Sequence, residues 1–148
     1  MPNEISVTDA HAMQQQGHTY VDVRSRPEFQ QGHPEGAINV PLIDVDSDTG
    51  QMQPNPDFVR VMQAVFPPDA KLLIGCQAGG RSLRASQMLE AFGFTDVTNV
   101  RGGFGGARDP MTGRVLDQGW VDAGLPTSVE PAPGASYEEL LARADAKG

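Results

Sequence analysis

The sequence predicts an α/β domain built around a mostly parallel sheet. Short runs of β-branched and aliphatic residues alternate along the chain with stretches whose apolar residues recur at helical spacing, which is the pattern of strands joined by crossover helices. A length of 148 residues and a hydrophobic fraction of 39% fit one domain that buries its own core. We expect this domain to cover residues 1–128, and a Pro-rich linker with a short helix to make up residues 129–148.

The first part of the chain is predicted to alternate between short strands and short helices. The predicted strands cover residues 5–7, 19–23 and 37–40, and the predicted helices cover residues 10–16 and 24–31. Thr8 is a candidate N-cap for the first helix, which should stop at Gly17. Pro27 suits the first turn of the second helix. Pro41 should end the third strand, because proline cannot donate a hydrogen bond to a sheet.

The rest of the chain continues this alternation. Strands are predicted for residues 71–75 and 97–100, helices for residues 58–65, 82–92 and 136–147, and long loops for residues 43–57 and 102–119. Asp57 is the expected cap of the first of these helices, and Ser136 with Glu139 predicts a capping box before the last. The apolar face of the middle helix is predicted to consist of Leu83, Ala85, Met88, Leu89 and Phe92.

Charge and cysteine content argue against several classes of function. A net charge of −8 disfavours binding to nucleic acids or to anionic membranes, because both would repel the chain. The one cysteine cannot form an internal disulfide or a cysteine-based zinc site, and residues 44–50 depart from the spacing of a calcium loop. We therefore predict neither a metal nor a cofactor. The N-terminal stretch lacks a basic region followed by an apolar run, and no apolar run approaches membrane-spanning length, so we expect a cytoplasmic protein.

The strongest chemical signal is the loop between the strand predicted for residues 71–75 and the helix that follows. The loop opens on Cys76 and closes on Arg81, with Gly79 and Gly80 between them. The glycines allow positive φ angles, so that successive N–H groups can converge on an anion at the helix N-terminus. Arg81 suits the binding of tetrahedral oxyanions. The same field favours the thiolate of Cys76, which is the nucleophilic form.

Two other interpretations of this loop compete with the first. Cysteine is often buried as a small apolar residue, and residue type alone favours that outcome for Cys76. The glycines and the arginine at this spacing, between a strand and a helix, favour a reactive thiol instead. A phosphate loop of the nucleotide-binding type is disfavoured, because no Gly-Lys-Ser/Thr follows.

Three stretches, in the right order, resemble signatures of the rhodanese-like domain family. Residues 21–41 resemble its upstream signature through Val-Asp-Val-Arg, Pro-Glu-Phe, Gly-His and Gly-Ala-Ile-Asn-Val-Pro. Residues 76–81 resemble its six-residue active-site loop, which begins with cysteine and ends with arginine. The residues of the third stretch are Val100, Gly102, Gly103, Trp120 and 124–126. The resemblance spans about residues 5–127.

The resemblance implies a five-stranded parallel sheet with helices on both faces, and an enzyme that transfers sulfur. Cys76 would attack the outer sulfur of a small anionic donor such as thiosulfate and carry that sulfur as a persulfide. A thiol, cyanide or a protein acceptor would then take it. The residues implied to bind the substrate are Gln77, Ala78, Gly79, Gly80 and Arg81.

The same resemblance leaves three alternatives. The family's phosphatases and arsenate reductases carry a longer loop, usually with histidine before the cysteine, whereas Gly75 stands there in this chain, so sulfur chemistry is favoured over phosphate chemistry. The other two alternatives are a non-catalytic rhodanese-like module that binds a partner and a redox-sensing thiol at Cys76.

Several polar residues are interpreted as structural support. Asp22 stands inside an apolar run, where a buried carboxylate needs a partner, and we expect it to hold neighbouring backbone or Arg24. Arg24, and Ser82 at the predicted start of the helix, are likewise expected to support the site. Glu28 is interpreted as a first-turn helix residue and His33 as a packing residue.

Residues 104–118 exceed the family's usual spacing and are interpreted as an insertion that either covers the loop or projects away from it. Phe104 and Trp120 are the aromatic residues of interest, with core packing expected for Trp120. We interpret three arginines near the site as solvated surface charges that could rim it: Arg24, Arg84 and Arg101.

Overall fold

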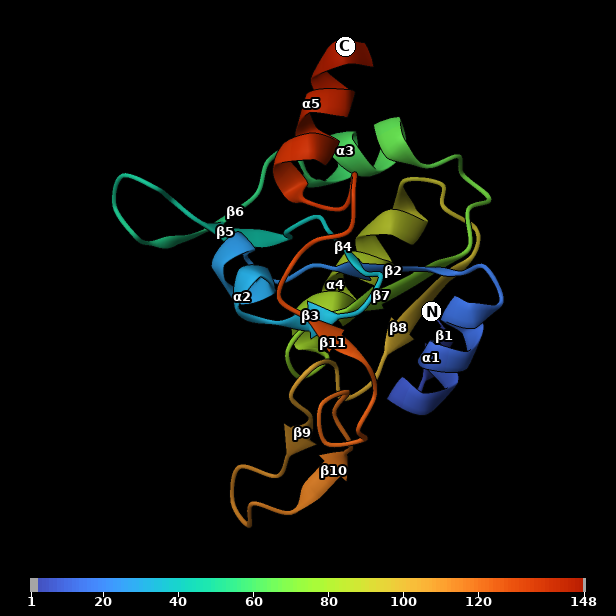
Figure 1. The fold of residues 1–148 in the computed structure, drawn as a ribbon, viewed down its shortest axis with the longest axis vertical. Helices are drawn as coiled ribbons and strands as arrows, with labels where there is room; N and C mark the ends of the chain where they lie inside the picture. The colour runs from blue at the N-terminus through green and yellow to red at the C-terminus, as the bar shows by residue number, and fades with distance from the viewer. Residues whose placement is uncertain (1–2, 148) are drawn as a thin grey trace.

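The computed structural model describes residues 3–147 and contains a five-stranded parallel sheet (Figure 1). The strands are β1 (Asn3–Ile5), β2 (Thr19–Asp22), β4 (Ile38–Asn39), β7 (Leu72–Gly75) and β8 (Val97–Val100). Their order is β1-β8-β7-β2-β4, and each neighbouring pair is parallel. The prediction of an α/β fold with a mostly parallel sheet is confirmed.

Helices cover both faces of this sheet. They are α1 (Val7–Gln15), α2 (Arg26–Gln31), α3 (Phe58–Val65), α4 (Gly80–Ala91) and α5 (Tyr137–Lys147). Successive side chains of a strand point to opposite faces. In β7, Leu72 and Ile74 accordingly join one core with α3, α4 and α5, whereas Leu73 joins a second core with α1 and α2. Within residues 3–147 none of the helices has the length and apolar character needed to span a membrane.

The last residue of β7, Gly75, has no room for a side chain. A Cβ at this position would overlap the hydroxyl of Tyr20, which lies on the neighbouring strand β2 and is buried. Burial raises the pKa of Tyr20 well above its usual value, and the nearby Asp22 carboxylate raises it further. A neutral phenol therefore fills the space beside Gly75, and packing accounts for the glycine that precedes Cys76.

Residues 43–57, predicted to be a loop, contain an antiparallel hairpin. Its strands are β5 (Ile43–Val45) and β6 (Met52–Pro54). The loop prediction is wrong here: β5 is partly buried and β6 is exposed, and each strand has only three residues, too short for a clear periodic signal. Pro54 is tolerated at the end of a strand in an isolated two-stranded sheet.

Two helices begin earlier than predicted. α1 starts directly after Ser6, which is its N-cap in place of Thr8. The Ser6 hydroxyl accepts a hydrogen bond from the backbone N–H of Asp9 at 3.2 Å. α4 starts at Gly80, directly after Gly79, whose left-handed conformation ends the loop.

The buried face of α4 also differs from the predicted one. Met88 and Phe92 are 37% and 57% exposed. The buried positions of the helix are Ser82, Ala85, Ser86 and Leu89. Two of them are serines, so a search for apolar residues alone misses this face. Both hydroxyls have partners: Ser86 donates to the backbone oxygen of Ser82 at 2.7 Å, and the Ser82 hydroxyl donates to the Asn99 side chain at 2.6 Å.

The predicted caps of α3 and α5 form in part. Asp57 stands at the N-cap of α3 but makes no capping hydrogen bond, and its carboxylate pairs with Arg60 instead. Ser136 accepts a hydrogen bond from the N–H of Glu139 at 3.3 Å before α5. The return half of this capping box is missing, since the Glu139 carboxylate accepts from the Ser136 hydroxyl and from the N–H of Gly134 instead. α5 packs on α3 and contributes side chains to the first core (Figure 1).

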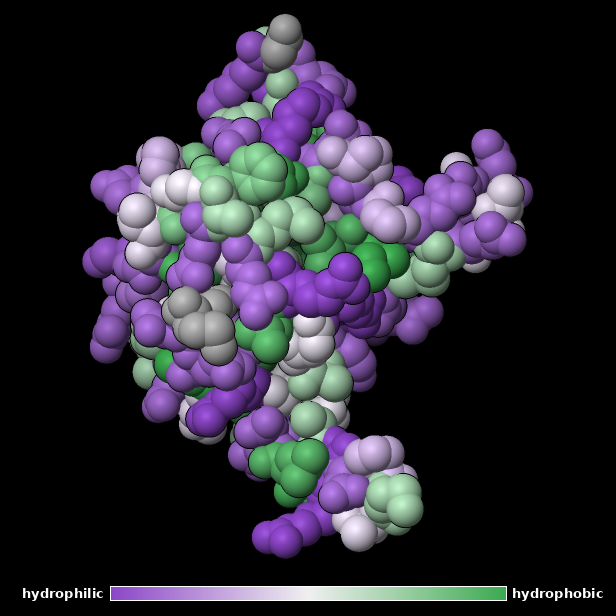
Figure 2. Space-filling model, turned by 180° about the vertical axis from the view of Figure 1, so that it is seen from behind, coloured by the Kyte–Doolittle hydropathy of each residue, from purple (hydrophilic) through white to green (hydrophobic). Residues whose placement is uncertain are grey.

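Residues 104–118 form a projecting arm. Within it β9 (Ala107–Arg108) and β10 (Val115–Asp117) pair as an antiparallel hairpin. The arm extends below the sheet in Figure 1 and stands clear of the body in Figure 2. At its root, the Phe104 ring lies against Gly32, the residue before β3 (His33–Pro34), which pairs with β11 (Thr127–Ser128). Of the two outcomes considered for this insertion, the structure has the one in which the tip projects away.

Candidate active site

Cys76 lies at the carboxyl end of β7, on the central strand of the sheet. Its side chain is buried, with 2% of its surface exposed. Its Sγ accepts a hydrogen bond from the backbone N–H of Gly79 at 3.1 Å. Gly79 has a φ of +117°, which side chains rarely permit, and this conformation leads the chain into α4 directly after the N–H donor. The sulfur therefore lies beside the positive end of α4, whose first residue follows Gly79.

The rest of the loop departs from the predicted nest in one respect. Only Gly79 takes a positive φ, whereas Gly80 is already the first residue of α4 and has no such angle. Gln77 and Ala78 are exposed at the mouth of the loop. Ser82 supports the turn from inside, with its hydroxyl 3.1 Å from the backbone oxygen of Gly79, in the position that the sequence suggested.

Asp22, the last residue of β2, and Arg24 form a buried ion pair. The Asp22 carboxylate accepts hydrogen bonds from the backbone N–H of Arg24 at 3.0 Å and from its guanidinium at 2.7 to 3.1 Å. The guanidinium also donates to the backbone oxygen of Gly32 and to the side chain of Gln77. Asp22 thus has the partners expected for it. Arg24 is 3% exposed, so its interpretation as a surface charge is wrong, whereas its contacts fit the structural support also expected of it.

Arg81 and Glu28 form a second ion pair, which the sequence did not reveal. Two guanidinium nitrogens of Arg81 donate to the two carboxylate oxygens of Glu28 at 2.8 and 3.0 Å. The Arg81 hydrogen bond holds the pKa of Glu28 down from 4.5 to about 2, and Glu28 in turn raises the pKa of Arg81. Ser25 holds the same carboxylate through a complete capping box at the start of α2. Arg81, predicted to bind substrate, is therefore engaged by the protein itself.

The topology explains why these residues meet. β2 and β7 are parallel neighbours, with Asp22 opposite Gly75. The segments that follow the two strands therefore emerge at the same edge of the sheet, where α/β proteins usually bind ligands. One segment carries Arg24 and Glu28, and the other carries Cys76 and Arg81.

Phe104, at the root of the arm, is the aromatic residue of the site. Its backbone N–H donates to the oxygen of Cys76 at 2.8 Å, and the next residue donates to the oxygen of Gln77 at 2.9 Å. The guanidinium carbon of Arg24 lies 4.4 Å from the centre of the Phe104 ring. A hollow of about 390 Å³ opens beside this contact. Its lining residues are Arg24, Glu28, Gln31, Gly32, Gln77 and Phe104.

The other residues singled out from the sequence lie outside this cluster of charged side chains. His33 is buried, stacks on Phe29 with ring centres 3.8 Å apart, and bonds the Phe29 backbone oxygen, so it packs as predicted. Arg84 and Arg101 are exposed. Trp120 is fully buried in the second core.

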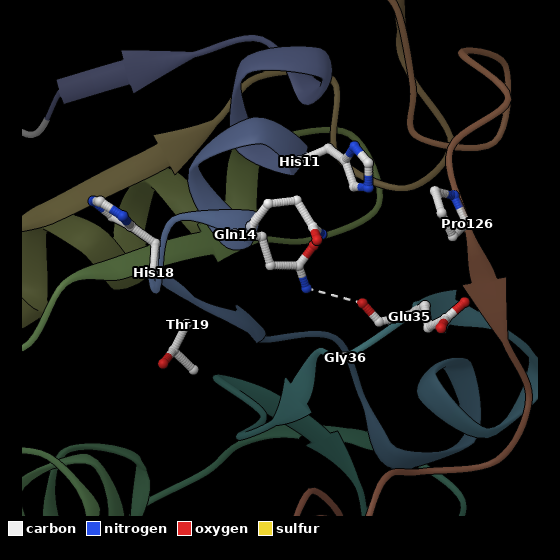
Figure 3. Close-up of a pocket in the computed structure, with 8 residues that line it drawn as sticks. His11, Gln14, His18, Thr19, Glu35, Gly36 and Pro126 are labelled. Carbon is white, nitrogen blue, oxygen red and sulfur yellow. Dashed lines mark hydrogen bonds between the residues drawn. The ribbon is translucent and has the colours of Figure 1, made fainter.

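A larger hollow of about 590 Å³ lies between α1 and the segment around Glu35 (Figure 3). His11, Gln14 and His18 line it from the first of these elements and the turn after it, and the Gln14 amide donates to the backbone oxygen of Glu35. None of the loop residues 76–81 lines this hollow. In residues 3–147 no group of three or more His, Cys, Asp or Glu side chains is arranged to hold a metal ion.

A protein family, curated relatives and solved structures all resemble this chain over most of its length. The rhodanese-like domain family matches residues 6–108. Thiosulfate sulfurtransferase 16, chloroplastic, of Arabidopsis thaliana is 39% identical over 127 residues, which cover 86% of this chain and 93% of that protein. Thiosulfate sulfurtransferase 18 of the same plant is 34% identical over 128 residues, with coverages of 85% and 83%. Among solved structures, the crystal structure of Rv0390 from M. tuberculosis has a TM-score of 0.70 at 26% identity and covers 86% of this chain and 98% of its own. These matches support a sulfurtransferase-type enzyme.

Proposed function

Because the chain belongs to the rhodanese-like domain family, we propose that it moves a sulfane sulfur from thiosulfate or a similar donor to a thiophilic acceptor through a persulfide on Cys76. The observation that carries this proposal is the hydrogen bond from the Gly79 N–H to the Sγ of Cys76. A backbone donor fixed on sulfur, beside a helix N-terminus, stabilises a thiolate and can also stabilise the persulfide anion that replaces it.

The first step is a displacement at sulfur. The Cys76 thiolate attacks the outer sulfur of thiosulfate, a new S–S bond forms, and the S–S bond of thiosulfate breaks. Its electron pair leaves with sulfite, so the products are the Cys76 persulfide anion and the sulfite dianion. No proton needs to move in this step, which agrees with the absence of a histidine among the residues that line the hollow beside the loop.

The second step returns the enzyme to its starting state. A thiolate or cyanide attacks the outer sulfur of the persulfide, the Cys76–sulfur bond breaks, and its electron pair restores the thiolate. The chain contains one cysteine, so no second thiol of the same chain can take the sulfur. The acceptor is therefore a separate molecule, either a small thiol, cyanide or a thiol on another protein. Neither a metal nor a cofactor is required, because both steps are two-electron displacements.

The fit of Gly75 against Tyr20 supports sulfur chemistry over phosphate chemistry. A histidine before the cysteine, as in the family's phosphatases, could not be placed beside Tyr20 without displacing its ring. The loop also keeps the six-residue spacing from Cys76 to Arg81.

The test is steady-state formation of thiocyanate from thiosulfate and cyanide by the purified chain. We expect turnover by the native protein and none by Cys76→Ser, which keeps the shape of the side chain but not its nucleophilicity. Loss of turnover in both proteins, together with sulfenic acid formation at Cys76 under low peroxide, would favour the redox-sensing thiol instead.

A further inference from the structure

Four charged side chains meet beside Cys76, and each is already paired. Arg24 contacts Asp22 at 2.7 Å, and Arg81 contacts Glu28 at 2.8 Å. These four groups together carry no net charge, in a chain whose net charge is −8. A dianionic donor that reaches this cluster therefore finds both guanidinium groups occupied by carboxylates.

The two pairs differ in how easily they can open. The side chains of Arg24 and Asp22 are 4% and 2% exposed, so separating them would leave two charges buried without partners. The side chains of Arg81 and Glu28 are 23% and 32% exposed, so water can take over from either partner. Arg81 is thus the cation of the cluster that can exchange its carboxylate for a substrate.

The geometry of the Arg81 contact makes this exchange competitive. Glu28 occupies two nitrogens of the guanidinium, which is the fork that a planar or tetrahedral oxyanion also prefers. Glu28 lines the same hollow as Gln77, next to the Cys76 loop. A donor anion must therefore displace the carboxylate or bind close to its negative charge.

We propose that Glu28 is a specificity-determining residue, whose carboxylate competes with the anionic donor for Arg81 and selects against doubly charged donors. The inference deepens the proposed function, because it concerns the donor of the sulfur that Cys76 would accept. Coulomb repulsion from Glu28 acts twice as strongly on a dianion as on a monoanion. The site is thereby biased towards donors of low charge, such as monoanionic thiosulfonates and organic persulfides, over free thiosulfate.

A purely structural role for Glu28 predicts the opposite sign. If the Glu28 carboxylate served only to orient Arg81, neutralising it would leave the guanidinium less well held. The affinity for every anionic donor would then fall by the same factor. Glu28→Gln separates the two roles well. Glutamine preserves the shape of the side chain and can complete the capping box with Ser25, so the start of α2 should remain folded.

The test measures donor affinity without sulfur transfer. In a Cys76→Ser background, the dissociation constants of thiosulfate, a dianion, and methanethiosulfonate, a monoanion, are measured by titration calorimetry with and without Glu28→Gln. We expect thiosulfate to bind about tenfold tighter after Glu28→Gln and methanethiosulfonate about threefold tighter, with both gains shrinking in high salt. The matched control is Glu130→Gln, an equal change of charge at an exposed linker residue, which should leave both constants unchanged.

Equal or weaker binding of thiosulfate after Glu28→Gln overturns the proposal, and so does an equal gain for both donors. These outcomes do not depend on persulfide chemistry. Failure of the native protein to form a persulfide would instead contradict the proposed function, so the two failures are told apart.

Discussion

The backbone N–H of Gly79 donates to the Sγ of Cys76 at 3.1 Å, across three residues of the chain. Gly79 itself adopts a φ of +117°, the conformation that joins the loop to α4 directly after this donor. The reactivity proposed for Cys76 thus depends on the backbone conformation of one glycine.

Gly79→Ala should therefore impair sulfur transfer more than it impairs folding. A side chain at this φ costs about 1–2 kcal/mol of stability. A shift of this N–H away from the sulfur should slow formation of the persulfide about tenfold to a hundredfold, less than the roughly hundredfold to thousandfold cost of removing such a donor outright. The rate is measured by quenching the reaction with thiosulfate at several times and determining the persulfide fraction from the intact mass. Gly93→Ala is the matched control, because Gly93 has a φ of +101° with open space around it and lies at the far end of α4. An equal rate loss in both variants would assign the effect to strain alone.

Gly75→Ala should destabilise the fold through Tyr20. The new methyl group would overlap the Tyr20 hydroxyl and ring inside a buried core, and overpacking of this kind costs about 1–3 kcal/mol. Tyr20→Phe removes the hydroxyl, so the double variant should be more stable than the sum of the single effects predicts. Urea unfolding of the native chain, the two single variants and the double variant completes this double-mutant cycle. Strict additivity would show that the Tyr20 hydroxyl is not what excludes a side chain at Gly75.

Stability should fall in acid partly through Glu28. The folded state lowers the pKa of Glu28 from 4.5 to about 2, so its contribution is present above pH 4.5 and is lost as the pH falls towards 2. Since the side chain is 32% exposed, solvent screening limits the contribution to about 1 kcal/mol or less. Urea unfolding from pH 6 to pH 2 measures it. The free energy of unfolding of the native chain should decline more steeply below pH 4.5 than that of Glu28→Gln, and parallel curves would argue against the pair.

The tip of the arm should be dispensable for sulfur transfer, whereas its root should not be. Phe104 contacts Arg24 and bonds the backbone of Cys76, but the hairpin beyond it projects from the body. Replacing residues 109–113 by an Asn-Gly turn should leave thiocyanate formation unchanged. Phe104→Ala should reduce it about threefold, the equivalent of one partly exposed cation–π contact. A large loss on shortening the tip would show that the arm acts as a lid.

Most of the fold could be predicted from the sequence because most strands of the sheet are short apolar runs. The four inner and later strands and the loop that begins at Cys76 follow from local patterns, as does the helix after it. The first strand was predicted over residues 5–7 but is β1 at Asn3–Ile5, an exposed edge strand, and Val7 already belongs to α1. The hairpin over residues 43–57 escaped prediction because its two strands have three residues each, one partly buried and one exposed, and so give little periodic signal. The serine-lined face of α4 escaped for a related reason, since buried hydroxyls carry no hydrophobic signal.

The site was less predictable, because its pairs join distant parts of the chain. Glu28 and Arg81 are separated by 53 positions and meet only because β2 and β7 are parallel neighbours. Glu28 also had a sufficient local explanation as the partner of Ser25 in the capping box, which concealed its second partner. A signal was available in the rule that segments after adjacent parallel strands share one edge of the sheet. The cytoplasmic location expected from the sequence stays a prediction.

The most direct measurement is the intact mass of the purified chain after incubation with thiosulfate and removal of excess donor. Sulfur transfer predicts a product heavier by one sulfur atom, located on Cys76, absent from Cys76→Ser and discharged by cyanide with release of thiocyanate. An unchanged mass of the native chain, with the Cys76 thiol still free to alkylation, would contradict a persulfide at this residue.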